Sequence, residues 1–63
     1  MIGELRIYYQ DKFGGWHLGL GGFEEEQTAI EAAKDLSEQM RAKIRIVEAL
    51  TGRVRSVVEV VFA

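Results

Sequence analysis

The chain has 63 residues, no cysteine and a single histidine, and its formal net charge is -2. A chain of this length forms one domain, here residues 1–63, and buries only about 60% of the surface that its unfolded form exposes. Disulfides are excluded, and so is a zinc site, because one histidine has no thiol partners. Small domains without these supports commonly oligomerise, and we expect the same here.

The hydrophobic and charged fractions, 48% and 29%, are those of a folded protein. No apolar run approaches the ~20 residues that a membrane-spanning helix needs, and the N-terminus has neither the basic nor the long apolar stretch of a secretory signal. The sequence therefore predicts a cytoplasmic protein that does not contact a membrane.

The first two segments, residues 4–9 and 16–20, alternate apolar and polar side chains with the period of half-buried strands. Residues 10–15 between them are polar and glycine-rich, so the two segments predict a hairpin. In the second segment Gly19 points to the face opposite the apolar side chains, so that face of the strand carries few side-chain atoms. The apolar sets are Leu5, Ile7 and Tyr9, then Trp16, Leu18 and Leu20.

After Gly21 and Gly22 the apolar period becomes helical. Three glutamates at residues 24–26 lie at the expected start of this helix, and Arg41 and Lys43 lie near its end, which suits the helix dipole. Glu24 stands at the expected cap position, where Ser, Thr, Asp or Asn is usual. The apolar stripe consists of Ala29, Ile30, Ala33, Leu36, Ser37 and Met40.

Residues 43–48 and 54–62 are rich in β-branched residues and flank a short turn at Thr51 and Gly52, which predicts a second hairpin. The fold predicted is therefore α+β: a four-stranded antiparallel sheet of order β-β-α-β-β, with one helix packed on one face.

A single helix leaves the other face of such a sheet uncovered. Alternation then assigns side chains to the two faces. The inward set is Leu5, Ile7, Trp16, Leu18, Ile44, Ile46, Val54, Val58, Val60 and Phe62. The outward set is Arg6, Tyr8, His17, Lys43, Arg45, Val47, Arg53, Arg55, Val57, Glu59 and Val61.

Three of the outward residues, Val47, Val57 and Val61, predict a self-association surface, because a monomer gains nothing by exposing neighbouring valines. The last strand is almost continuously apolar and has neither proline nor lysine to prevent pairing with another chain. We therefore expect a homo-oligomer, with a dimer favoured. The alternative is that a bulge shifts the alternation and these valines belong to the core.

The basic outward residues support a second hypothesis, binding of single-stranded nucleic acid, with Tyr8 or His17 as a stacking ring. The overall acidity argues against indiscriminate binding, and arginines on a hairpin are also commonly solvated or paired with carboxylates such as Glu48 and Glu59. The residues that would contact phosphate are Arg6, Lys43, Arg45, Arg53 and Arg55.

No constellation of residues points to catalysis. Histidine is the residue type whose ordinary pKa lies near neutrality, and the chain has only one, His17. Ser37 and Ser56 therefore have no further histidine that could act as a general base. The glycine pairs lack the Lys-Ser/Thr of a phosphate-binding loop. We therefore expect a non-enzymatic protein without a cofactor or a metal.

Four segments carry a resemblance: residues 15–18, Phe23 followed by residues 29–33, residues 44–47 and residues 51–54. In these segments the chain resembles small prokaryotic strand-strand-helix-strand-strand domains of unknown function. The resemblance implies the same fold and no catalytic residues, since the shared positions are packing and turn positions. Taken together, the sequence predicts a small interaction or assembly module, with nucleic-acid binding as the alternative.

Overall fold

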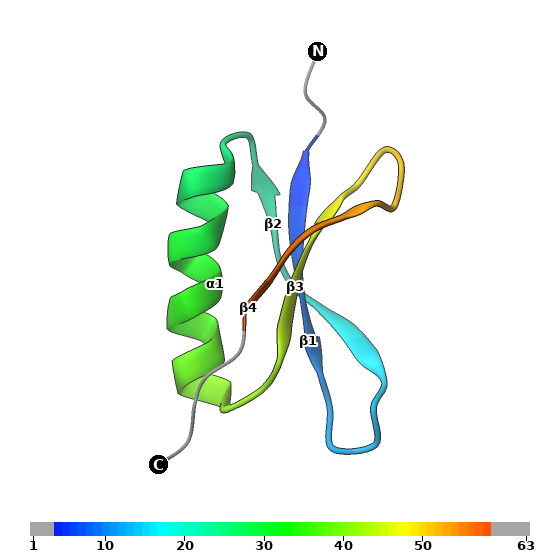
Figure 1. The fold of residues 1–63 in the computed structure, drawn as a ribbon, viewed down its shortest axis with the longest axis vertical. Coiled ribbons are helices and arrows are strands. Elements are labelled where there is room, and N and C mark those ends of the chain that lie inside the picture. The colour runs from blue at the N-terminus through cyan, green and yellow to red at the C-terminus, as the bar shows by residue number, and fades with distance from the viewer. Residues whose placement is uncertain (1–3, 59–63) are drawn as a thin grey trace.

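Residues 4–58 are described by the computed structural model, and they form one sheet and one helix (Figure 1). The helix lies along one face of the sheet, whose strand order is β2-β1-β3-β4 with every pair antiparallel. The predicted α+β fold and the β-β-α-β-β order are therefore confirmed. The elements are β1 (Leu5–Gln10), β2 (Trp16–Phe23), α1 (Glu26–Met40), β3 (Ile44–Glu48) and β4 (Val54–Val58).

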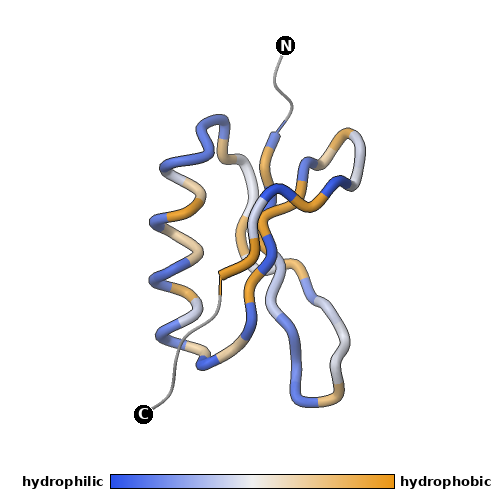
Figure 2. The backbone as a smooth tube through the Cα atoms, viewed as in Figure 1, coloured by the Kyte–Doolittle hydropathy of each residue, from blue (hydrophilic) through white to orange (hydrophobic). Residues whose placement is uncertain are grey.

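The inner face of the sheet, defined here as the face that α1 covers, holds the core. Leu5 and Ile7 of β1 and Ile44 and Ile46 of β3 are buried there, and the two buried alanines of α1 let the helix approach closely. In Figure 2 hydrophobic residues recur along α1 between hydrophilic ones, as an amphipathic helix requires. The side chains packed around this core are Tyr9, Phe23, Ile30, Ala32, Leu36 and Val58.

The ends of α1 depend on few side-chain interactions. Glu25 is the N-cap, one residue later than expected, and its side chain makes no capping hydrogen bond. Arg41 ends the helix in the left-handed conformation, with φ 52°. Ser37 is fully buried, and its hydroxyl donates a 2.9 Å hydrogen bond to the carbonyl of Ala42. This bond ties the last turn of the helix to the connection that leads into β3.

Strand β2 presents its faces in the opposite sense from the prediction. Trp16 pairs with Gln10 and Leu18 with Tyr8, so both side chains lie on the outer face, away from the helix. Gly19 faces inward, where an added Cβ would lie 3.0 Å from Leu36. The assignment of Trp16 and Leu18 to the core is therefore wrong. Alternation identifies two faces but not which of them meets the helix, and here the helix packs against the glycine.

Strand β4 also departs from simple alternation. A register shift beside Val47 places Val54 opposite it on the outer face and turns Arg55 toward the helix side. The predicted inward position of Val54 and outward position of Arg55 are both wrong, because a bulge reverses the alternation beyond it. Val58 packs on the core as predicted. Residues 59–63, among them Val60 and Phe62, lie outside the described residues.

Among residues 4–58, no helix is long and apolar enough to cross a membrane.

Candidate functional site: the outer face of the sheet

The outer face, defined by the sheet residues that point away from α1, carries a continuous row across all four strands. The pairing registers align Leu18, Tyr8, Arg45 and Val57 side by side. Leu18 is 55% exposed and Val57 is 53% exposed, at the two ends of this row. A second row aligns Arg6, Val47 and Val54. Apolar or aromatic side chains therefore lie on every strand of the outer face without a covering element, and Arg45 and Arg6 lie between them.

Arg45 and Trp16 meet across strand β1. The guanidinium carbon of Arg45 lies 4.0 Å from the centroid of the Trp16 ring, which is cation–π geometry. No carboxylate pairs with Arg45 in the part of the chain that the structure describes. A stacked guanidinium keeps the edge of its plane available for hydrogen bonds.

A small hollow of about 200 Å³ opens beside this stack, and we call it the Trp16 hollow. Gly52, in the connection between β3 and β4, closes one side of it and adopts φ 75°, which favours glycine. Its remaining walls are aromatic, aliphatic and guanidinium groups. The lining residues are Tyr8, Trp16, Arg45, Val47, Gly52 and Val54.

Arg6 lies on the outer face as predicted, but it forms an ion pair with the carboxylate of Glu4. Its Nε donates a 2.9 Å hydrogen bond to Oε2 of Glu4, which also accepts a bond from the backbone N–H of Gly22. The hydrogen bond to Glu4 is the main cause of the raised pKa of Arg6, and a hydrogen bond to Tyr8 is the next largest. The hydrogen bond from Arg6 in turn lowers the pKa of Glu4. Arg6 is therefore a partly neutralised charge at the rim of the face.

Arg55, one of the predicted phosphate contacts, does not belong to the outer face, which corrects its predicted position. Its guanidinium lies 2.6 Å from Glu48 and 3.5 Å from Glu26 of the helix. The hydrogen bond from Arg55, followed by one from Thr51, lowers the pKa of Glu48. The alternative considered from the sequence, that an arginine pairs with Glu48, is therefore confirmed for Arg55.

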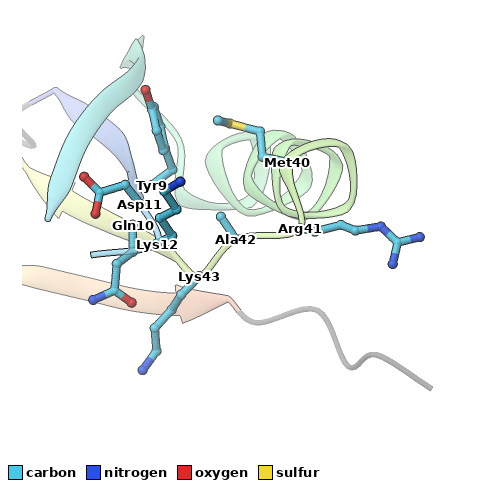
Figure 3. Close-up of a pocket in the computed structure, with 8 residues that line it drawn as sticks. All are labelled: Tyr9, Gln10, Asp11, Lys12, Met40, Arg41, Ala42 and Lys43. Carbon is cyan, nitrogen blue, oxygen red and sulfur yellow. The ribbon is translucent and has the colours of Figure 1, made fainter. Parts of the chain in front are cut away.

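The remaining predicted cations lie at the ends of strands. Arg53 is exposed in the connection before β4, where its backbone N–H bonds Oγ1 of Thr51. Lys43 is exposed immediately before β3, and Figure 3 shows its side chain pointing to the same side as that of Gln10. The structure therefore leaves Arg45, with Arg6 and Lys43 beside it, as the cations nearest the centre of the outer face.

Two of the three predicted self-association residues, Val47 and Val57, lie on the outer face in neighbouring rows. The third, Val61, lies outside the described residues. The structure adds Trp16, Leu18 and Val54 to this surface, which alternation assigns to the core. The pairing of β3 with β4 is interrupted beside Val47, and the sequence pattern does not show the position of this interruption.

A separate polar cluster fixes the β1–β2 connection. Oδ1 of Asp11 accepts hydrogen bonds from the backbone N–H groups of Phe13 and Gly15, and Oδ2 lies 2.6 Å from Nε2 of His17. The hydrogen bond with His17 is the main cause of the lowered pKa of Asp11, and the hydrogen bond from the backbone N–H of Gly15 is the next largest. His17 stacks on Tyr9 on the inner side of β2, so its predicted outward position is wrong. This cluster shapes a turn.

An open hollow of about 550 Å³ lies where the end of α1 meets the end of β1 (Figure 3). Its cationic side chains do not converge, since Arg41 and Lys43 point in different directions in Figure 3. Within residues 4–58, no group of three or more His, Asp or Glu side chains could hold a metal ion. We therefore take the outer face as the candidate site.

Comparison of the chain with protein-family models, with curated proteins and with solved structures finds no match. The resemblance to small prokaryotic domains of the same element order remains a prediction from sequence. Function is therefore inferred from the geometry of this chain alone.

Proposed function

We propose that this protein is a non-enzymatic, cytoplasmic assembly module whose copies associate through the outer face and the β4 edge of the sheet. The observation that carries the proposal is a group of uncovered apolar side chains at the β4 side of the outer face, beside an edge that pairs with no other described strand than β3. Val54 and Val57 of β4 are exposed there, and Val47 of β3 pairs with Val54. An apolar surface that a monomer's own helix cannot cover is typical of an interaction site.

The β4 edge supports the proposal in a second way. Among the described strands, β4 is hydrogen-bonded only to β3, so one side of its backbone is not used by the sheet. Its residues are mostly valine, and they include no proline or lysine. Such an edge favours addition of a strand from another chain. The opposite edge, β2, is interrupted by glycines and by register shifts, which disfavour pairing.

We favour association of two β4 edges about a two-fold axis over stacking of two outer faces. Stacking would bring Arg45 and Arg6 of both copies together in a poorly hydrated interface, and like charges there are destabilising. Pairing at the edges keeps these cations apart and places Val57 of each copy next to the joint. A two-fold contact of this kind is closed and gives a dimer rather than a filament.

The test is the mass in solution, measured by light scattering over a wide range of concentrations for the wild type and two matched variants. Val57→Glu and Leu18→Glu change equally exposed residues of the same row at opposite edges. We expect a wild-type dimer, a monomeric Val57→Glu variant and a dimeric Leu18→Glu variant. Circular dichroism checks that both variants remain folded.

Two results would contradict the proposal. A wild-type monomer at every concentration would remove self-association altogether. Disruption by Leu18→Glu together with a dimeric Val57→Glu variant would place the contact at the β2 side of the sheet.

A further inference from the structure

We infer that the Trp16 hollow binds single-stranded nucleic acid, with a base stacked on the aromatic side chains and a phosphate held by Arg45. This goes beyond the assembly proposal and is independent of it. The hollow opens on the outer face, which association of the β4 edges leaves accessible.

The aromatic surface of the hollow suits a nucleic-acid base. Trp16 and Tyr8 both line the hollow, and both lie on the open face of an antiparallel sheet. Neither ring is buried under the helix, and the Arg45 guanidinium covers only one of the two faces of the Trp16 ring. Aromatic side chains on open sheets stack with unpaired bases whatever the sequence, because every base has a π-face. Aliphatic Val47 and Val54 form the rest of the wall and suit the flat apolar surface of a base.

The guanidinium of Arg45 suits a phosphate. Stacking on Trp16 at 4.0 Å fixes its plane, and no carboxylate within residues 4–58 pairs with it. Arg55 and Arg6 provide the contrast, because carboxylates occupy both of them. A fixed, unpaired guanidinium can bind the oxygens of a phosphate through two N–H groups at once.

The distribution of charge favours a polyanion on the outer face. The exposed surface of α1 carries Glu31, Asp35 and Glu38 against a single lysine, Lys34, and three further glutamates lie at residues 24–26. The cations of the outer face lie on the other side of the sheet. A polyanion is therefore repelled from the helix side and attracted to the outer face, although the net charge of the chain is -2. An acidic peptide would meet the same charge but would make less use of the aromatic rings.

Trp16 is the only tryptophan in the chain, so its fluorescence reports directly on the hollow. The probe is an oligothymidylate of about ten nucleotides, a length that a single small domain can span. We expect saturable quenching of the emission by this strand. We also expect affinity to fall as salt is added, with a logarithmic slope of about -0.7 for each phosphate bound.

Matched variants locate the site. Arg45→Gln should lower the affinity about tenfold, whereas Arg55→Gln, on the same hairpin but on the helix side, should leave it unchanged. Trp16→Leu should lower it by about tenfold as well, measured by the anisotropy of a labelled strand because the tryptophan is lost. Circular dichroism of each variant confirms that the fold is retained, as expected for residues outside the core.

Several outcomes would overturn the inference: absence of quenching at low salt, equal binding by the wild type and Arg45→Gln, or equal binding of polyphosphate and the oligonucleotide. The last would show attraction to any polyanion without use of the rings. Tighter binding of polyglutamate than of the oligonucleotide would also overturn it, and would assign the hollow to an acidic protein partner. Light scattering of the same samples separates these results from any change in association.

Discussion

The two faces of the sheet carry similar apolar residues, but those of the inner face are buried and those of the outer face are mostly exposed. The inner face places Leu5, Ile7, Ile44 and Ile46 against small residues of the helix, and all four are buried. The outer face places Leu18, Val54 and Val57 in the open, with Trp16 and Tyr8 only partly covered. Hydrophobicity alone therefore does not separate core from surface in this chain. The position of the helix does, because only one face has a layer to pack against.

The difference also explains where the largest side chain lies. The helix approaches β2 closely at Gly19, and its Leu36 occupies the space that a side chain would need. A tryptophan on that side would have to displace the helix. Trp16 instead lies on the outer face, where it supports Arg45. Replacement of Trp16 should therefore cost far less stability than replacement of a core aromatic residue.

The largest expected effect is at the centre of the inner face. Ile7→Ala should cost about 2–5 kcal/mol of the free energy of unfolding, because it leaves a cavity beneath the helix. A single small core supplies roughly 3–5 kcal/mol in all, so the variant should be largely unfolded. Leu18→Ala, on the outer face of the neighbouring strand, should change stability by about 0.5 kcal/mol or less. Urea denaturation followed by circular dichroism measures both, and equal losses would refute the assignment of the faces.

A smaller effect separates the two faces of strand β2 itself. Gly19→Val should cost about 1–3 kcal/mol, since its side chain would overlap Leu36, Tyr9 and the backbone of Ile7. Gly21→Val is the control, because Gly21 faces the outer side, where its nearest neighbours are the exposed side chains of Glu4 and Arg6. Thermal denaturation of the pair should show a lower melting temperature for Gly19→Val alone. The reverse order would mean that β2 presents its other face to the helix.

The smallest effect is the pH dependence of the turn. Hydrogen bonds from His17 and Gly15 hold the pKa of Asp11 below its ordinary value of 3.8, so the folded state binds this proton less readily than the unfolded state. The resulting stabilisation is complete above the unfolded pKa and is lost as the pH falls through the folded pKa. Glu4 and Glu48, whose pKa values are also lowered, act in the same direction.

We therefore expect the urea midpoint of the wild type to fall below about pH 4 and that of Asp11→Asn to fall less steeply over the same interval. Parallel curves for the two proteins would show that the bonds of Asp11 to the turn add no stability. A urea series at several pH values from neutrality down to about pH 3 is sufficient for this comparison.

The elements and their order could be predicted from the sequence because each depends on local signals. The alternation in β1 and β3, the helical period of the stripe that includes Ala29 and Ala33, and the glycine at residue 52 are all local. The composition of the outer face could not be predicted in the same way. It depends on which side of β2 meets the helix and on a bulge beside Val47, and both are set by packing between distant segments.

The candidate site shows the same limit. Simple alternation from neighbouring residues places Val47, Val57 and Arg45 correctly on the outer face. It misplaces Trp16, because a large aromatic residue in an alternating strand is usually assigned to the core. The one available signal is Gly19, whose lack of a side chain is also typical of a strand that another element approaches closely.

Hydrogen exchange at the two edges of the sheet is the sharpest test of association through β4, because only that edge should pair with a second copy. Amide exchange is followed in β4 and in β2 as the protein concentration is raised. We predict that amides of residues 54–58 become more protected with concentration while those of residues 16–23 do not. Rapid exchange of the amides of residues 54–58 at every concentration, no slower than that of residues 16–23, would contradict edge association.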